Sequence, residues 1–282
     1  MPLVSSLPLL RDAMAECYAL GAFNFWNLEM AQAIVEAAED EGAPAILQVN
    51  PAGIRYGGLA PLAAIGVAVA QAAKVPVALH LDHGTGIALA TQCLRLGFTS
   101  IMFDGSGEAF EKNTAQTRLI CEMGHAVDVP VEGELGAIGG REEGAASGVV
   151  LTDPDEARRF VELTGVDALA IAVGSAHGMQ RQEAELDVER ISRIKERTRV
   201  PLVLHGASGV PDEGVREAVS RGIAKINVST YINTRFLRGT AAAMAASPGE
   251  NDPKPLLLAG KAAAKEAVRE KLRLLGSSGR AK

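Results

Sequence analysis

Aromatic residues, cysteines and long apolar runs are all scarce in this chain of 282 residues. Aromatics make up only 4% of a sequence that is 48% hydrophobic, so Ala, Val, Ile and Leu must fill the core. The longest weakly polar stretch, residues 59–73, contains Gln71 and falls short of the roughly 20 apolar residues that span a bilayer. The chain also starts without a basic segment followed by an apolar one. We therefore expect no membrane association and a cytoplasmic location.

The charge and the cysteines narrow the choice of partners. Lys and Arg number 28 and Asp and Glu number 34, which gives a net charge of −6 and argues against a nucleic-acid surface. Cys17, Cys93 and Cys121 are odd in number and far apart, which favours thiols in a reducing compartment over disulfides. The partner is expected to be a small molecule whose anionic groups are held by backbone amides and a few cations.

Eight short β-branched runs recur along the chain, and stretches of helical periodicity such as residues 28–41 and 155–164 lie between them. Eight strands in this length give about 35 residues per unit, which predicts an α/β fold of the (β/α)₈ TIM-barrel type, with a doubly wound sheet as the alternative. Residues 1–282 are interpreted as one domain, with residues 240–282 as a helical tail. The strands are expected at residues 22–25, 45–49, 76–81, 99–103, 130–135, 168–173, 202–204 and 223–228.

Polar residues stand where each predicted strand stops, which is where active sites of such barrels lie. Strand ends often meet solvent, so each residue alone is about as well explained by exposure as by function. Taken together, the set predicts a site. Its members, in strand order, are Asn24, Asn50, Asp82 with His83, Asp104 with Ser106, Glu132 with Glu134, Ser175 with His177, His205 with Ser208, and Asn227 with Ser229.

Three of the five histidines, His83, His177 and His205, end strands three, six and seven. Three imidazoles leave one coordination position open, as catalytic zinc sites do. A single histidine at a strand end is more often a hydrogen-bonded structural residue, but three together favour a metal site. Asp82 precedes His83 and is either a proton carrier or a carboxylate that orients an imidazole. His80 is expected in the core.

Two segments of small residues, 204–209 and 227–230, follow strands seven and eight. Loops in these positions expose successive backbone amides and form the usual phosphate cradle of this barrel. Lys225 lies inside strand eight and is either a Schiff-base nucleophile or a buried counter-charge. The glycine-rich residues 132–150 predict a long loop above the barrel, with Glu142 inside it.

Seven motifs in order resemble those of the class II, metal-dependent ketose-bisphosphate aldolases, and the likeness covers essentially the whole chain. It is greatest to the tagatose-bisphosphate aldolase branch, because Ser229 follows Asn227-Val228 where typical fructose-bisphosphate members have an aspartate. The motifs are Gly21-Ala22-Phe23-Asn24, His80-Leu81-Asp82-His83-Gly84, Asp104-Gly105-Ser106, Val131-Glu132-Gly133-Glu134-Leu135-Gly136, Gly174-Ser175-Ala176-His177-Gly178, Leu204-His205-Gly206-Ala207-Ser208-Gly209 and Lys225-Ile226-Asn227-Val228.

The resemblance implies reversible cleavage of a ketose 1,6-bisphosphate to dihydroxyacetone phosphate and an aldehyde such as glyceraldehyde 3-phosphate. It implies one Zn²⁺ per subunit on His83, His177 and His205, Glu134 as ligand of an alternative metal position, and a monovalent cation (Na⁺ or K⁺) near the phosphate. Asp82 and Glu142 would move protons at oxygen and carbon, and Arg280 would reach a neighbouring subunit of a homodimer or homotetramer. Substrate and phosphate contacts would come from Asn24, Asn50, Gly178, Gly206, Ala207, Ser208, Asn227, Ser229 and Thr230.

Four departures from the family pattern concern the acceptor end of the site. Asn50 replaces Ser or Thr, Gly107 replaces a histidine, Gly133 replaces alanine, and Phe25-Trp26 is bulkier than usual. An aldolase for a different acceptor, or a non-catalytic phosphosugar-binding subunit, is therefore kept as the alternative. A barrel hydrolase would need paired histidines at the end of strand one, where this chain has Asn24, Phe25 and Trp26.

Overall fold

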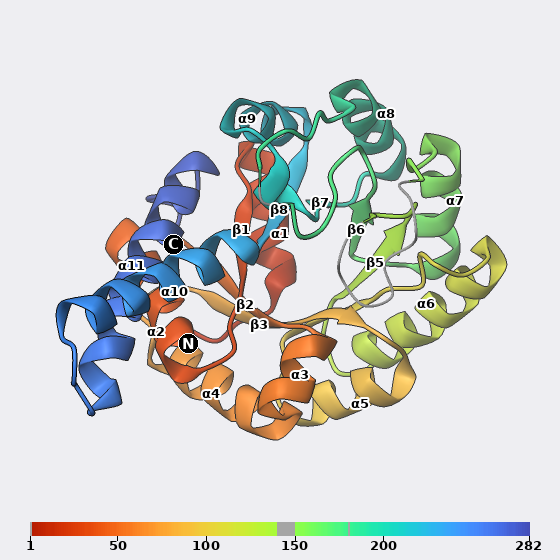
Figure 1. Ribbon diagram of the computed structural model, residues 1–282. Coiled ribbons are helices and arrows are strands. Elements are labelled where there is room, and N and C mark those ends of the chain that lie inside the picture. Colours follow the sequence, from red (N-terminus) through yellow and green to blue (C-terminus); the bar gives the residue numbers. More distant parts are fainter. Residues whose placement is uncertain (1, 140–149, 180) are drawn as a thin grey trace.

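A computed structural model describes residues 2–139, 150–179 and 181–282. Eight parallel strands pair in chain order, and β8 pairs with β1, so the sheet closes into a barrel (Figure 1). The predicted (β/α)₈ barrel is confirmed, and the doubly wound alternative is wrong. The strands are β1 (Leu20–Asn24), β2 (Ala45–Val49), β3 (Val77–Gly84), β4 (Ser100–Phe103), β5 (Val131–Leu135), β6 (Ala168–Ile171), β7 (Leu202–Leu204) and β8 (Ile223–Val228).

Helices surround the barrel, and their ends follow local sequence signals. Asn27 caps the start of α2 through its side-chain oxygen, and Gly42 ends that helix with a positive φ of 55°, so the predicted range 28–41 is confirmed. The helices are α1 (Ser6–Glu16), α2 (Leu28–Glu41), α3 (Pro51–Gly57), α4 (Leu59–Ala72), α5 (Ile87–Arg95), α6 (Phe110–His125), α7 (Pro154–Thr164), α8 (Val188–Thr198), α9 (Asp212–Arg221), α10 (Thr230–Ala246) and α11 (Pro253–Leu274), with a 3₁₀ turn at Ala207–Gly209.

Helix α1, which the sequence analysis does not predict, closes the amino-terminal end of the barrel. Its Leu10 and Ala13 pack with interior residues such as Leu20 and Ile46 in a small separate core. The larger core lies between the strands and the outer helices. Since the interior below the site is packed, the carboxyl ends of the strands are left for polar side chains.

Residues 240–282, predicted as a helical tail, hold the last part of α10 and all of α11, and α11 lies against α2 (Figure 1). Glu41 at the end of α2 accepts hydrogen bonds from Arg273, Arg269 and Ser278. The bond from Arg273 contributes most to lowering the pKa of Glu41 to about 2. This contact ties the tail to the barrel, whereas the interpretation of 1–282 as one domain stays a prediction.

Within the described residues, no single helix has the length and apolar character needed to cross a membrane. Among the described helices, the pair α3 and α4 together has this length and composition, but the two helices are bent by 100° at the break between them.

Candidate active site

A bulge at the end of β3 places two neighbouring polar side chains at the barrel mouth. Leu81 pairs with Ile101 of β4, but Gly84 pairs with Phe103, so β3 holds one extra residue over this interval. In a regular strand Asp82 and His83 would point to opposite faces. His83 instead has a positive φ of 48°, and both side chains contact groups inside the barrel. The bulge therefore explains how one Asp-His dipeptide serves a single site.

The structure brings the three predicted metal ligands together. One ring nitrogen from each of His83, His177 and His205 lies within 4.8 Å of the others. The ring centroid of His83 is 5.0 Å from that of His177 and 4.7 Å from that of His205. The three histidines come from β3 and from the segments that follow β6 and β7, so only the closed barrel makes them neighbours.

The orientation of two of these rings fits a shared cation. His83 Nδ1 lies 2.8 Å from Asp104 Oδ2, and His205 Nε2 lies 3.0 Å from Glu132 Oε1. Carboxylates only accept, so each of these nitrogens carries the ring proton. The opposite nitrogens, His83 Nε2 and His205 Nδ1, then face each other with lone pairs at 2.9 Å. A cation between them removes that repulsion, so the donor set suits a divalent metal of the zinc type.

Half-buried Asp104 and buried Glu134 both lie beside His83, but their pKa values shift in opposite directions. Burial acts to raise the pKa of Asp104, but hydrogen bonds from His83 and Ser106 hold that pKa below its usual value. Burial, reinforced by the charge of Asp104, raises the pKa of Glu134 well above its usual value. Glu134, Asp104 and His83 have ligand atoms within 4.8 Å of one another, so this group is a second place that could hold a metal ion. Glu134 belongs to this group and not to that of the three histidines.

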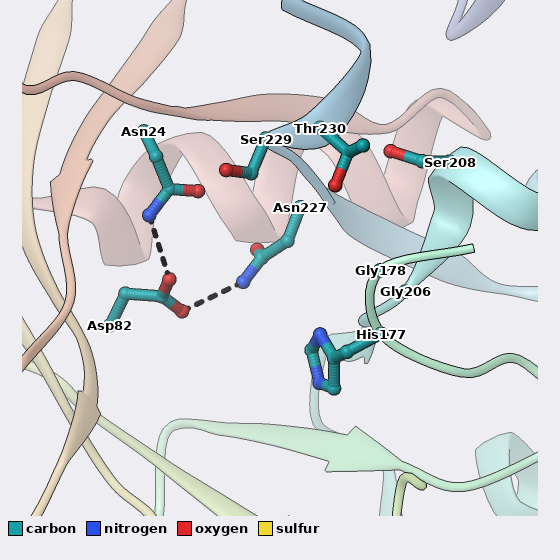
Figure 2. Close-up of a pocket in the computed structure, with 9 residues that line it drawn as sticks. All are labelled: Asn24, Asp82, His177, Gly178, Gly206, Ser208, Asn227, Ser229 and Thr230. Atoms are coloured by element: carbon teal, nitrogen blue, oxygen red, sulfur yellow. Dashed lines mark hydrogen bonds between the residues drawn. The ribbon is translucent and has the colours of Figure 1, made fainter. Parts of the chain in front are cut away.

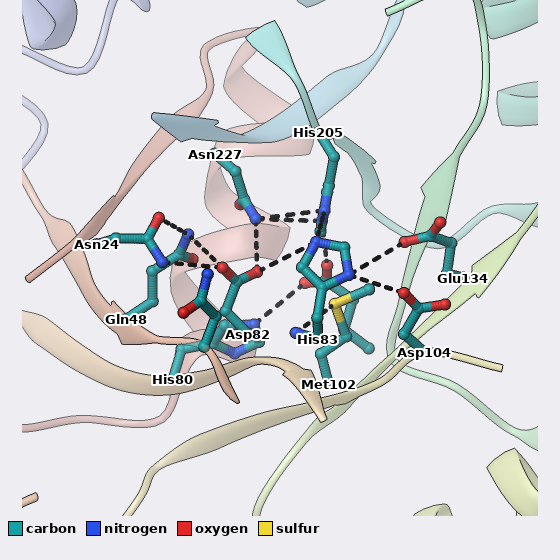
Figure 3. A network of polar contacts seen from close by, with 12 residues as sticks. Asn24, Gln48, His80, Asp82, His83, Met102, Asp104, Glu134, His205 and Asn227 are labelled. Carbon is teal, nitrogen blue, oxygen red and sulfur yellow. Dashed lines mark hydrogen bonds and ion pairs between the residues drawn. The ribbon is translucent and has the colours of Figure 1, made fainter. Parts of the chain in front are cut away.

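Asp82 is held as a hydrogen-bond acceptor by three amide side chains from three other strands (Figure 3). Asn24 Nδ2 and Gln48 Nε2 donate to Oδ2 at 2.9 and 3.3 Å, and Asn227 Nδ2 donates to Oδ1 at 2.9 Å. The sequence analysis expects Asn24 and Asn227 at the site but misses Gln48. The signal available in the sequence is a single polar residue within the otherwise apolar run Ala45–Val49, and the structure buries this residue fully. Fixed in this way, the carboxylate can take a proton from a substrate hydroxyl beside it.

A polar pocket opens next to Asp82 and His177 (Figure 2). Helix α10 begins here at Thr230, and Gly206, in a left-handed conformation with φ 66°, starts the 3₁₀ turn. Among the described residues no side chain caps the first turn of α10, and Ser229 and Thr230 at this helix start line the pocket, so the first backbone N–H groups of α10 suit an anion there. The residues that line the pocket are Asn24, Asp82, His177, Gly178, Gly206, Ser208, Asn227, Ser229 and Thr230.

Three other predicted site residues do not line this pocket, and a fourth falls outside the part of the chain that the structure describes. The side-chain oxygen of Asn50 accepts from Gly53 N at 3.0 Å and so caps α3, which is a structural role. Ala207 lies in the 3₁₀ turn between Gly206 and Ser208, which line the pocket, and is itself 7% exposed. Arg280 pairs with Glu16, at the amino-terminal end of the barrel, so its expected contact with a neighbouring subunit stays a prediction. Glu142 lies outside the described residues.

The contacts of Lys225 decide between the two roles predicted for it, a Schiff-base nucleophile and a buried counter-charge. Its Nζ lies 2.8 Å from Glu132 Oε2 and 3.4 Å from His80 Nε2, and the residue is 1% exposed. An amine held in a buried ion pair and away from the pocket is unsuited to attack a carbonyl, so the structure favours the counter-charge. His80 is buried, as expected of a core residue.

The closed barrel and the polar pocket at the carboxyl ends of its strands are those of a (β/α)₈-barrel enzyme. The family model described as fructose-bisphosphate aldolase class-II matches residues 4–280. The chain belongs to the class II fructose-bisphosphate aldolase family and is a lyase.

Relatives and solved structures agree with this family. The fructose-bisphosphate aldolase of Thermus caldophilus is 42% identical over 305 residues, covering 99% of this chain and 100% of the relative. The probable fructose-bisphosphate aldolase of Bacillus subtilis (strain 168) is 42% identical over 285 residues and covers both chains completely. The crystal structure of the YdjI aldolase from Escherichia coli K12 has a TM-score of 0.89 at 34% identity, covering 99% of this chain and 100% of that one.

Proposed function

We propose that this aldolase is metal-dependent and reversibly cleaves a ketose 1,6-bisphosphate into dihydroxyacetone phosphate and an aldehyde such as glyceraldehyde 3-phosphate. The observation that carries the proposal is the convergence of His83, His177 and His205 within 4.8 Å beside the clamped carboxylate of Asp82. A divalent cation on these imidazoles would stabilise the negative charge that carbon–carbon cleavage leaves on the ketose oxygens.

The residues of the chain have distinct roles in this reaction. Asp82 takes the proton of the hydroxyl on the carbon that becomes the aldehyde when its bond to the ketose half breaks, and returns it in condensation. The amides of Asn24 and Asn227 keep its oxygens in place. The start of α10 and the turn at Gly206 hold the phosphate of the dihydroxyacetone half through backbone N–H groups. Glu142 remains the proposed proton carrier at carbon.

The substrate within the family is a finer proposal. Ser229 lines the pocket, and the matching position of typical fructose-bisphosphate members holds an aspartate. This difference supports a preference for tagatose 1,6-bisphosphate, or for a ketose phosphate built from another acceptor aldehyde. Trp26 supports a changed acceptor end, because it packs over Gly53 in an apolar cleft beside α10. Zinc, a nearby monovalent cation, the cytoplasmic location and the homodimer or homotetramer are proposed on the resemblance and sequence arguments above.

A cleavage assay against fructose, tagatose and related ketose phosphates, with and without a chelator, tests the proposal. We expect cleavage of at least one ketose bisphosphate, loss of activity after metal removal and recovery with Zn²⁺. Full activity after rigorous metal removal would contradict the metal dependence. Binding of these sugars without any cleavage would favour the alternative of a phosphosugar-binding subunit, although the three amides that hold Asp82 speak against it.

A further inference from the structure

A buried chain of polar groups runs beneath the three histidines, and Lys225 is its only ammonium group in the described part of the barrel interior. The pairing of β7 with β8 shifts register just before Lys225. Leu202 pairs with Ile223 whereas Val203 pairs with Lys225, which leaves Ala224 as an extra residue. The bulge turns the Lys225 side chain into the barrel, where it reaches Glu132 on the opposite strand β5.

The contacts of this chain are continuous. Lys225 Nζ bonds Glu132 Oε2 at 2.8 Å and His80 Nε2 at 3.4 Å. The other oxygen of Glu132 contacts His205 Nε2 at 3.0 Å, and the other ring nitrogen of His80 contacts Ser100 Oγ at 2.7 Å. All five residues are at most 4% exposed, so the hydrogen bonds are not shared with bulk water.

The chemistry of Lys225 and Glu132 sets the direction of the hydrogen bonds that these two residues make. An ammonium only donates and a carboxylate only accepts. Lys225 therefore donates to His80 Nε2, whose ring proton must lie on Nδ1 facing Ser100. Burial, with the charge of Lys225, lowers the pKa of His80 well below its usual value, which agrees with a neutral ring. On the other side, His205 donates from Nε2 to Glu132, so its lone pair lies on Nδ1, which faces His83 at 2.9 Å.

We propose that Lys225 is a positioning residue that acts through Glu132 to fix the tautomer of His205, so that Nδ1 is the nitrogen available to the metal. The inference rests on the metal site of the proposed function. A merely structural ion pair between Lys225 and Glu132 would leave the ring proton of His205 on either nitrogen, whereas the proposed role requires this proton on Nε2.

Replacing Glu132 by glutamine separates the two roles. In Glu132→Gln, Lys225 still requires an acceptor, so the amide oxygen turns to Nζ and the amide NH₂ faces His205 Nε2. The ring proton of His205 then moves to Nδ1 and blocks the metal. In Glu132→Gln with Lys225→Met, the NH₂ can donate to His80 Nε2, which is 3.8 Å from the present Oε2, and the amide oxygen accepts from His205 again. The second substitution should thus restore what the first removes.

The experiment measures ¹⁵N shifts of the histidine rings in the metal-free protein and the affinity for Zn²⁺ by competition with a chromogenic chelator. We expect the Nε2–H form of His205 in the wild type and the double variant, and the Nδ1–H form in Glu132→Gln. Zinc affinity should fall about 10–100-fold in Glu132→Gln and recover to within a few-fold in the double variant. The matched control is Glu36→Gln, which alters the surface pair of Glu36 with Lys261 and should leave both readouts unchanged.

An Nδ1–H tautomer in the wild-type protein would overturn the inference, whether or not the variants fold. A double variant that binds zinc more weakly than Glu132→Gln would also overturn it. Two independent structural losses would add and weaken zinc binding further, whereas a restored His205 tautomer would strengthen it again. The tautomer is read without metal. A wild type that binds no zinc would therefore refute the metal dependence of the proposed function without deciding the tautomer.

Discussion

Asn227 Nδ2 lies 2.9 Å from Asp82 Oδ1, so β8 donates a hydrogen bond across the barrel to the proposed proton carrier on β3. Asn24 and Gln48 donate to the other carboxylate oxygen from β1 and β2. Asp82 is thus fixed by three strands, whereas His83 beside it is directed to the histidine cluster. One bulge supplies both the proton carrier and a metal ligand.

Asp82→Asn should lower kcat by about 10²–10⁴-fold, since an amide cannot accept the substrate proton. The NH₂ group of the new asparagine also faces the NH₂ groups that donate to Asp82 in the wild type, so one hydrogen bond is lost between two donors. We therefore expect the free energy of unfolding to fall by about 1–3 kcal/mol. Zinc binding should persist, because the three histidines are unchanged. Steady-state kinetics, thermal unfolding and zinc titration check these effects, with Asp12→Asn on the surface of α1 as control. Wild-type turnover in Asp82→Asn would place the activity elsewhere.

Gln48→Leu should lower kcat about 10-fold while the protein still folds, because Asp82 loses the hydrogen bond from the Gln48 amide and is held less firmly. The bonds from Asn24 and Asn227 remain, so the loss should be smaller than in Asp82→Asn. The comparison is made by kinetics at saturating substrate, with the exposed Gln71→Leu as control. If Gln48→Leu changed only thermal stability, Gln48 would be a packing residue and not one that positions Asp82.

The eight strands and most strand-end residues could be predicted because parallel strands buried on both faces read as apolar runs that stop at polar groups. The three histidines followed from the same rule. Gln48 was missed because it lies within such a run and not at its end. Asn50 stands at a strand end, yet its oxygen caps α3, and sequence alone does not separate capping from binding. The bulge in β3 depends on pairing with β4, which no local pattern encodes.

Glu41→Gln should weaken the attachment of the tail, and the loss should depend on pH. The pKa of Glu41 is lowered to about 2 in the folded protein, chiefly by Arg273, so its contribution to stability is present above its unfolded value of 4.5. That contribution disappears as the pH falls from about 4.5 towards 2, where the carboxylate takes up a proton.

We expect the difference in melting temperature between wild type and Glu41→Gln to be constant from pH 7 to about pH 5 and to shrink below it. Hydrogen bonds to a charged group suggest about 1–3 kcal/mol at neutral pH. Thermal unfolding from pH 3 to 7 measures this, and taking the difference removes the titration of other carboxylates. A difference that grew on acidification would show that Glu41 does not act through its charge.

Gly206→Ala should impair both phosphate binding and stability. Gly206 has a φ of 66°, which alanine adopts only at a cost of about 1–2 kcal/mol. An added Cβ would also lie 2.7 Å from the backbone carbon and oxygen of Ala176, next to His177. Because backbone must move, the pocket beside His177 should widen, and the KM for a ketose bisphosphate should rise about 10-fold or more.

Gly165→Ala is the matched control, since Gly165 also has a positive φ, of 73°, but an added Cβ meets nothing within 4 Å. Both variants should lose melting temperature, and Gly206→Ala should lose more. Only Gly206→Ala should bind substrate and inorganic phosphate more weakly. Equal phosphate affinity in the two variants would mean that the turn at Gly206 holds its conformation for folding alone, and that the phosphate is bound elsewhere in the pocket.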